Sequence, residues 1–196
     1  MNGSRAIAGP RVVDLTVPPD RAFRLGVLSD THWYSRAAAV PESAIARMGA
    51  CDAYLHCGDF LQPALLQPLR ERAALFCVLG NVDPAELTEV TPARLLLRLG
   101  SWRIGAVHVA GHNRSAWRRT ADRFPERLDV LCFGHSHRSV AEQSDGIVFL
   151  NPGSAVDPRG QPAPSVAVLE MSDSLRVQVL RLAPLGAPQR SPAAQN

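Results

Sequence analysis

Short apolar runs that each end at a glycine or a polar residue recur along this 196-residue chain. Five of them are FRLGVL before Ser29-Asp30, AYLHC before Gly58-Asp59, ALFCVL before Gly80-Asn81, WRIGAV before His108, and LDVLCF before Gly134-His135. Apolar runs of this length closed by turn residues are typical of buried β-strands. The chain is therefore expected to build a sheet whose strands all end in polar loops.

Helical patterns fill the spaces between the first strands. They cover residues 41–49, residues 61–73 with Pro68 as a potential break, and residues 114–124. The later part of the chain is rich in strands, at residues 146–151, 165–171 and 175–182, and a Ser172–Ser174 turn joins the last two. We expect an α/β layered sandwich in one domain at residues 21–182. The Pro-, Gly- and Ala-rich ends, residues 1–20 and 183–196, are predicted to be a disordered arm and a disordered tail.

Composition excludes several classes of function. All 21 basic residues are arginine, which rules out Schiff-base chemistry and a phosphate-binding P-loop lysine. With a net charge of +3 and scattered arginines, a nucleic-acid partner is not expected. No apolar run is long enough to span a membrane, and the N-terminus lacks the apolar segment of a signal peptide, so we expect a cytoplasmic protein. The four cysteines form no C-x-x-C pair and are expected to be reduced, buried thiols.

Polar side chains at the strand ends have the chemistry of metal ligands. They are Asp30, His32, Asp59, Asn81, His108, His135 and His137. Loops at the carboxyl ends of strands converge, and an extended backbone would place the i, i+2 pairs Asp30/His32 and His135/His137 on one side. Imidazole nitrogen and carboxylate oxygen without thiolate suit Mn, Fe, Ni or Zn. Seven groups exceed the needs of one tetrahedral ion and suit two ions that share a bridging carboxylate. Each motif alone is often an ordinary turn, but their joint occurrence favours a metal centre.

The ordered blocks SDTH, CGDF, GNVD, AVH and GHSH, followed by LNPGS, resemble the calcineurin-like metallophosphoesterases. The resemblance runs from about residue 24 to 182 and is closest to the small bacterial and archaeal subfamily with GN-x-D and NPGS blocks. It implies a four-layer α/β/β/α sandwich. It also implies that Asp30, His32 and His137 hold one metal, that Asn81, His108 and His135 hold a second, and that Asp59 bridges them.

The implied activity is hydrolysis of a small phosphodiester by a metal-bridging hydroxide, with two divalent transition metal ions as cofactors. Manganese is the first expectation, and iron, nickel and zinc are the alternatives. Relatives of this size suggest a homodimer or homotetramer. The competing interpretation is a metal-binding scaffold or interaction module on the same fold. Such a scaffold would tolerate the loss of ligands, and here all seven are present.

The chain departs from the wider superfamily at Val82, where many members carry the histidine that protonates the leaving group. We predict either a substrate with a good leaving group or a substitute donor, for which His112 is the candidate. The spacing of His108 and His112 leaves open which of the two is the metal ligand. His108 is preferred because it directly follows an expected strand.

Other residues near the motifs are assigned supporting roles. Asp83 and Asn151 are expected to hold the ligand loops or contact the ligands, and Gly153 and Ser154 to shape a turn. Arg138 and Arg114 are candidates for phosphate contact, and Trp33 for contact with a substrate ring or for packing. His56, inside an expected strand, is assigned a buried structural or supporting role.

Overall fold

The computed structural model describes residues 9–32 and 42–183. Within them the strands form two sheets. The first sheet has six strands, in the order β1 (Arg11–Leu15), β5 (Arg94–Leu99), β6 (Trp102–Val107), β7 (Val130–Cys132), β9 (Ile147–Asn151) and β8 (Val140–Ser144). The second has five, in the order β11 (Leu175–Arg181), β10 (Ser165–Met171), β2 (Phe23–Leu28), β3 (Ala53–His56) and β4 (Ala74–Cys77).

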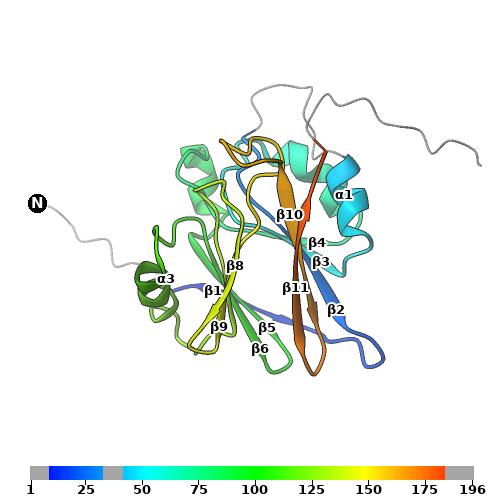
Figure 1. Ribbon diagram of the computed structural model, residues 1–196, viewed down its shortest axis with the longest axis vertical. Helices are drawn as coiled ribbons and strands as arrows, with labels where there is room; N and C mark the ends of the chain where they lie inside the picture. Colours follow the sequence, from blue (N-terminus) through cyan, green and yellow to red (C-terminus); the bar gives the residue numbers. More distant parts are fainter. Residues whose placement is uncertain (1–8, 33–41, 184–196) are drawn as a thin grey trace, which may run out of the picture.

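The sheets pack face to face and helices cover their outer faces (Figure 1). Between the sheets lies an apolar core that includes Leu25, Leu55, Leu97 and Cys132. On the outer face of the five-stranded sheet, α1 (Glu42–Met48) buries Ile45 and Met48 with residues of the sheet. This arrangement confirms the predicted α/β/β/α sandwich.

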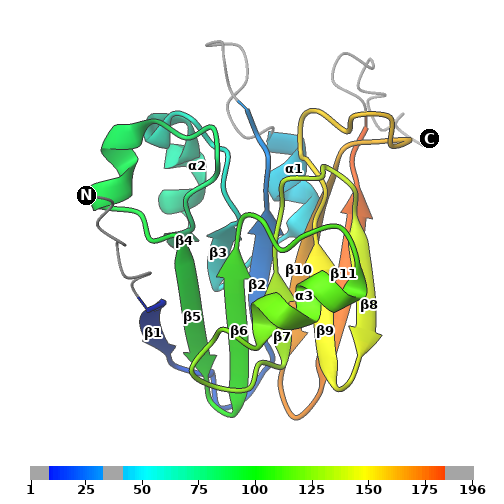
Figure 2. The same cartoon turned by 90° about the vertical axis from the view of Figure 1, so that its left-hand side faces the viewer.

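The third helix, α3 (Arg114–Ala121), covers the outer face of the six-stranded sheet, in front of β6, β7 and β9 in Figure 2. The centroid of the Trp117 ring lies 5.3 Å from the ring centroid of Phe133 and 5.7 Å from that of Phe149. The helix begins at an extended Asn113 whose side chain accepts the N–H of Ala116, which satisfies one of the free donors of the first turn.

Three short helical segments follow the strands of the five-stranded sheet. They are η1 (Pro63–Leu66), α2 (Gln67–Arg70) and η2 (Ala85–Glu89). The helix expected over residues 61–73 is thus divided into η1 and α2. Pro68 lies in the first turn of α2, where its missing N–H costs no helical hydrogen bond. No helix of the described residues has the length and apolarity needed to cross a membrane.

The expectation of a disordered arm over residues 1–20 is wrong for β1. Residues Arg11–Leu15 pair in parallel with Leu95–Leu99 of β5, and Val13 and Leu15 pack against the core between the sheets. The neighbouring prolines concealed this short alternation of apolar and polar residues. Strands β5 and β8 were also not expected, whereas β10 and β11 pair as an antiparallel hairpin around the expected turn. Except for Ala183, the expected C-terminal tail lies outside the described residues.

Strands β2, β3 and β4 of one sheet and β6 and β7 of the other point their carboxyl ends to the same edge of the sandwich, which is uppermost in Figure 2. There, Cys57 after β3 donates its N–H to Leu28 of β2, and Gly134 after β7 donates to His108 after β6. The loops that follow β2, β3, β4, β6 and β7 therefore meet in one place.

Candidate metal centre

The loops at this edge carry unusual backbone conformations. Eight described residues other than glycine have positive φ, and five of them are expected ligands: Asp30, His32, Asp59, His135 and His137. Their φ angles lie between 40° and 71°, in the left-handed region that residues with side chains seldom adopt. The expectation that extended backbone places the i, i+2 pairs on one side is therefore wrong. Both members of each pair reach the site from left-handed turns. Strain of this kind concentrates at functional sites.

Asp30, His32 and His137 form the first group of side chains. The Nε2 atoms of His32 and His137 lie 3.0 Å apart, and their rings stack with centroids 4.9 Å apart. Oδ1 of Asp30 lies 3.4 Å from Nε2 of His137 and 3.8 Å from Nε2 of His32. One ligand atom from each residue lies within 4.8 Å of the other two, so the group could hold one ion.

Asn81, His108 and His135 form the second group. Oδ1 of Asn81 lies 2.9 Å from Nε2 of His108 and 2.8 Å from Nδ1 of His135. The rings of His108 and His135 meet edge to face, with centroids 5.3 Å apart.

Asp59 lies between the two groups. Its Oδ2 is 3.6 Å from Nε2 of His32 and 3.1 Å from Nε2 of His108. Its Oδ1 accepts the N–H of Val82 at 3.0 Å. Ligand atoms of Asp30, Asp59 and His108 also lie within 4.8 Å of one another. A single carboxylate oxygen thus faces a nitrogen from each group.

Hydrogen bonds fix which ring nitrogen carries the proton in two of the histidines. Nδ1 of His137 lies 2.5 Å from the carbonyl of Asp157, and Nδ1 of His108 lies 2.8 Å from the carbonyl of Cys57. A carbonyl only accepts, so each Nδ1 must donate. In its neutral form, each ring then directs the lone pair of Nε2 into the site. This pattern, one nitrogen on a carbonyl and the other free to bind, is typical of histidines that ligate metals.

Charge is also arranged for a cation. Burial raises the pKa of Asp30, but hydrogen bonds to His32 and Ser29 and nearby histidine charge outweigh burial and leave the pKa below its ordinary value. Burial likewise raises the pKa of Asp59, yet bonds to His108 and the Val82 N–H bring the net pKa below normal. Two buried carboxylates are therefore ionised side by side. Burial lowers the pKa of His137, which keeps that ring neutral.

His108 behaves differently from His137. Burial lowers its pKa, but the hydrogen bond and the charge of Asp59 outweigh burial and raise the pKa above the ordinary value. The Asp59 carboxylate therefore attracts positive charge at the point where the two groups meet.

Asp83 ties the ligand loops together. Its carboxylate accepts the N–H groups of Asp59 at 3.0 Å, Phe60 at 2.8 Å, Leu61 at 2.7 Å and Gly80 at 2.7 Å. Four backbone donors on one side chain fix the loop after β3 against the loop after β4. The aspartate of the GNVD block thus holds the backbone of Asp59.

Asn151 and Ser154 hold the other side of the site. The Asn151 amide donates to the Gly134 carbonyl at 2.9 Å and to Ser136 Oγ at 3.1 Å, and so fixes the loop that carries His135 and His137. Ser154 Oγ donates to the Asp30 carbonyl at 2.6 Å. A turn was expected at Ser154. Its bond to the backbone of Asp30 was not, because the partners are 124 positions apart.

Two glycines allow the loops to approach. A Cβ on Gly134 would lie 1.9 Å from Ser29 Oγ and 2.7 Å from Asp30 Oδ2. A Cβ on Gly80 would lie 2.0 Å from Asp59 Oδ1. The glycine that precedes each ligand motif therefore makes room for a carboxylate of another loop, a role that the motif spelling alone does not reveal.

Other expected site residues lie apart from the two groups. His112 is exposed and makes no hydrogen bond or ion pair within the described chain, so it is His108 that lies among the ligands. Arg114 pairs with Glu142 at 2.7 Å, and Arg138 is exposed with only its backbone N–H bonded, to Ser136. Trp33 lies outside the described residues.

His56 lies in β3 and is fully buried. Its Nε2 is 3.1 Å from Thr31 Oγ1, and Thr31 stands between Asp30 and His32 in the sequence. Among the described residues, Nδ1 of His56 has no hydrogen-bond partner. His56 thus contacts the ligand loop without facing either group, as a supporting residue would.

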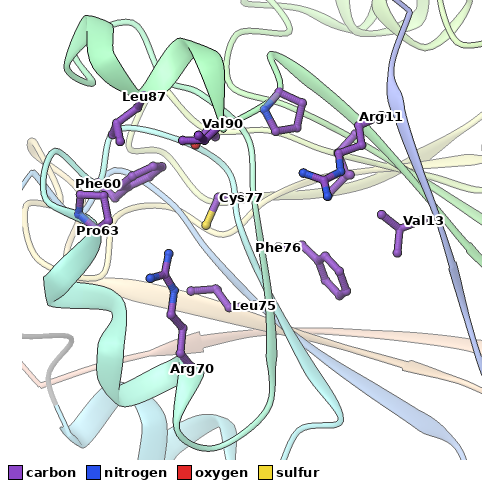
Figure 3. Close-up of a pocket in the computed structure, with 13 residues that line it drawn as sticks. Arg11, Val13, Phe60, Pro63, Arg70, Leu75, Phe76, Cys77, Leu87 and Val90 are labelled. Carbon is purple, nitrogen blue, oxygen red and sulfur yellow. The ribbon is translucent and has the colours of Figure 1, made fainter.

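A groove adjoins the second group. It has a volume of about 360 Å³, and Asn81 and His108 lie at one part of its wall. Val109, which is 50% exposed, contributes an apolar side, and Arg94 and Arg123 contribute positive charge. We call it the side groove. A separate pocket of about 400 Å³ contains none of the seven expected ligands and lies between β1 and β4 (Figure 3).

Comparison with known proteins gives concordant results. Residues 23–174 match the model of the calcineurin-like phosphoesterase superfamily domain. A protein of Methanothermobacter thermautotrophicus named as a probable metallophosphoesterase is 34% identical over 166 residues, which are 84% of this chain and 94% of that protein.

Two solved structures share the fold at lower identity. Vps29 of Chaetomium thermophilum has a TM-score of 0.67 and 23% identity, covering 83% of this chain and 100% of that one. A structure described as a novel archaeal phosphodiesterase has a TM-score of 0.62 and 21% identity, covering 81% of this chain and 100% of that one. At these identities the likeness concerns the fold alone.

Proposed function

Because the chain belongs to the calcineurin-like phosphoesterase superfamily, whose members use divalent metal ions, we propose that it hydrolyses small phosphodiesters at a two-metal centre. The first group would hold one ion, the second group the other, and Asp59 would bridge them. Two ions so held would activate a water molecule and neutralise charge on the phosphoryl oxygens. No side-chain nucleophile is needed.

One observation carries the proposal. Oδ1 of Asp30 and Nε2 of His137 lie 3.4 Å apart, although neither has a proton to share. The carboxylate is ionised, and the His137 proton resides on Nδ1, opposite the carbonyl of Asp157. Two buried lone pairs that face one another repel unless a cation lies between them. A divalent ion satisfies both, together with Nε2 of His32.

The second group supports the same assignment. Nε2 of His108 lies beside two oxygen acceptors, Oδ2 of Asp59 at 3.1 Å and Oδ1 of Asn81 at 2.9 Å. Imidazole nitrogens with carboxylate and amide oxygens, and no thiolate, suit manganese, iron, nickel or zinc. We propose manganese as the first metal to test.

Room beside the second group supports a diester. A phosphomonoester carries one organic group, whereas a diester carries two and needs space on both sides of the phosphorus. The side groove provides about 360 Å³ next to Asn81 and His108. Val82, 41% exposed, and Val109, 50% exposed, each follow a ligand and offer apolar contact to an ester group. Arg94 and Arg123 would attract an anionic substituent.

Protonation of the leaving group requires a donor other than Val82. Val82 cannot donate a proton, and His112 is exposed. We propose that substrates with good leaving groups are preferred and that His112 is the candidate donor for poor ones. His112→Ala should then slow an alkyl phosphodiester far more than an aryl one, by about 10²–10⁴-fold if His112 is the acid. Equal loss on both substrates would refute His112 as the donor.

The central test combines metal analysis with turnover. Purified protein is analysed for Mn, Fe, Ni and Zn, and hydrolysis of bis(4-nitrophenyl) phosphate is measured before and after chelation and after Mn²⁺ is restored. We expect activity to disappear on chelation and to return with metal. Asp59→Asn should lose it, whereas Asp145→Asn, with a 70% exposed side chain, should keep it.

Two outcomes would contradict the proposal in different ways. Protein that binds metal at both groups yet hydrolyses neither diesters nor monoesters would be the metal-binding scaffold. Protein that retains no metal and gains no activity from added metal would have no metal centre.

A further inference from the structure

A second pocket lies at the open edge of the sandwich, between β1 and β4 (Figure 3). We call it the edge pocket. Its volume of about 400 Å³ lies within the range of small-molecule sites. Most of its lining is apolar and includes Phe60, Pro63, Leu75, Phe76, Leu87 and Val90. None of the seven expected metal ligands contributes to it.

The edge pocket is positively charged. Arg11 of β1 and Arg70 of α2 line it, and none of its lining residues in the described part of the chain is acidic. In Figure 3 the two guanidinium groups turn toward the interior from opposite sides, on either side of Cys77. No carboxylate of the described residues pairs with either of these arginines. Other exposed arginines do find such partners, as Arg72 does with Glu42 and Arg114 with Glu142.

The floor of the edge pocket adds no charge of its own. Burial raises the pKa of the Cys77 thiol to about 12, although Arg70 acts in the opposite direction. The thiol therefore stays neutral and weakly polar at physiological pH. An occupant thus meets apolar walls, a neutral thiol and two guanidinium groups.

The edge pocket extends beyond the part of the chain that the superfamily model matches, since Arg11 and Val13 belong to β1 and the match begins at residue 23. We propose that the edge pocket binds a small amphiphilic anion, a single carboxylate on an apolar chain or ring. The carboxylate would lie between Arg11 and Arg70, where the planar guanidinium can donate two parallel hydrogen bonds. The apolar body would cover Phe60, Phe76 and Leu75.

Octanoate is a suitable probe because control compounds can test the contributions of its carboxylate and its apolar chain separately. Isothermal titration of the metal-loaded protein with octanoate should show saturable binding to one site. Acetate carries the carboxylate without the chain, and octanamide carries the chain without the charge. Neither should bind measurably. Acetate also tests for binding at the metal centre, because a carboxylate that only ligated the metals would bind with or without an apolar chain attached.

Variants locate the site. Arg11→Gln and Arg70→Gln should each weaken octanoate binding about tenfold or more, the value of a charge-assisted hydrogen bond. Val90→Glu places a carboxylate at a 68% exposed position on the rim and should abolish binding. The matched control is Arg176→Gln, which should bind octanoate like wild type. The Arg176 side chain is 73% exposed and lies on β11, at the edge of the five-stranded sheet opposite β4. Thermal unfolding verifies that every variant is folded.

Three results would overturn the assignment. They are the absence of octanoate binding by the wild type, equal binding of octanamide, and wild-type affinity in Arg11→Gln and Arg70→Gln. Because the readout is binding rather than hydrolysis, the outcome is independent of the phosphodiesterase proposal.

Discussion

The carboxylate of Asp83 accepts the backbone N–H of Asp59 at 3.0 Å, so one aspartate holds another in place. Asp83 belongs to the loop after β4 and also accepts the N–H groups of Phe60, Leu61 and Gly80. Asp59, held in this way, directs its own carboxylate toward His32 and His108. The geometry of the proposed bridging ligand therefore depends on a residue that need not touch either metal.

Replacing Asp83 with Asn should loosen the centre. An amide has one oxygen, so part of the four N–H groups that Asp83 accepts would face an NH₂ group instead. We expect the free energy of unfolding in urea to fall by about 1–3 kcal/mol. Metal affinity, measured by titration, should fall about 10–100-fold. Asp145→Asn is the matched control, and wild-type metal affinity in Asp83→Asn would show that the clamp is dispensable.

Gly134→Ala should disturb the first group specifically. The new methyl group would lie 1.9 Å from Ser29 Oγ and 2.7 Å from Asp30 Oδ2, which requires one of them to move. We expect a loss of about 1–3 kcal/mol in unfolding free energy, typical of overpacking, and a lower metal content. Gly9→Ala, with nothing within 4 Å of the added Cβ, is the control. Full metal content in Gly134→Ala would mean that the loop relaxes without moving Asp30.

The two histidines of GHSH should serve different ions. His137 lies with Asp30 and His32, whereas His135 lies with Asn81 and His108. His137→Ala should therefore lower occupancy mainly at the first group, and His135→Ala mainly at the second. Elemental analysis gives the number of ions lost, and anomalous diffraction from crystals of each variant gives their position. Loss of the same ion in both variants would contradict the division.

Stability should fall in acid partly because of His56. Complete burial lowers its pKa from 6.5 to about 3. A lowered pKa in the folded state means that the stabilisation is present above pH 6.5 and is lost as the pH falls toward 3. At pH 5 the loss from this residue is about 2 kcal/mol. Urea unfolding of metal-free protein at pH 7 and pH 5 should show that His56→Gln loses about 2 kcal/mol less than wild type. Equal pH dependence of the two proteins would contradict this origin.

If the substrate's second ester group occupies the side groove, Arg123 should affect KM. The test compares methyl 4-carboxyphenyl phosphate with its uncharged 4-carbamoyl counterpart. Arg123→Gln should raise KM for the carboxylate substrate up to about tenfold and leave its kcat and the carbamoyl substrate unchanged. Arg119→Gln, another exposed arginine of the same chain region, is the control. A similar KM for both substrates in the wild type would place the second ester group elsewhere.

The sequence predicted the fold well where local signals were strong. Apolar runs before Asp30, Asp59 and His108 are strands, because long apolar stretches closed by turn residues have few other stable conformations. It failed at β1, β5 and β8, of which β1 and β8 lie at the edges of the six-stranded sheet. Edge strands are short and half exposed, so their pattern resembles that of a loop. Only pairing with a distant strand makes them regular.

The seven expected ligands converge, yet the reason given for their convergence was wrong. Left-handed turns at Asp30, His32, His135 and His137, and not extended backbone, direct the side chains inward. Such conformations are stabilised by contacts between loops, among them the Asp30 carboxylate on the His135 N–H and Ser154 on the Asp30 carbonyl. Partners more than a hundred positions apart leave no local trace in the sequence.

Because of strand β1, the N-terminal limit of the family match differs from the N-terminal limit of the six-stranded sheet. The match to the superfamily model begins at residue 23, but the six-stranded sheet begins at Arg11. A chain cut before Phe23 would keep every expected ligand while it exposed the peptide groups of β5, from Leu95 to Leu99, to solvent. A bare strand edge invites pairing with another molecule. The shortened protein would then combine a complete set of expected ligands with poor solubility, because the matched domain starts after β1 whereas the six-stranded sheet includes it.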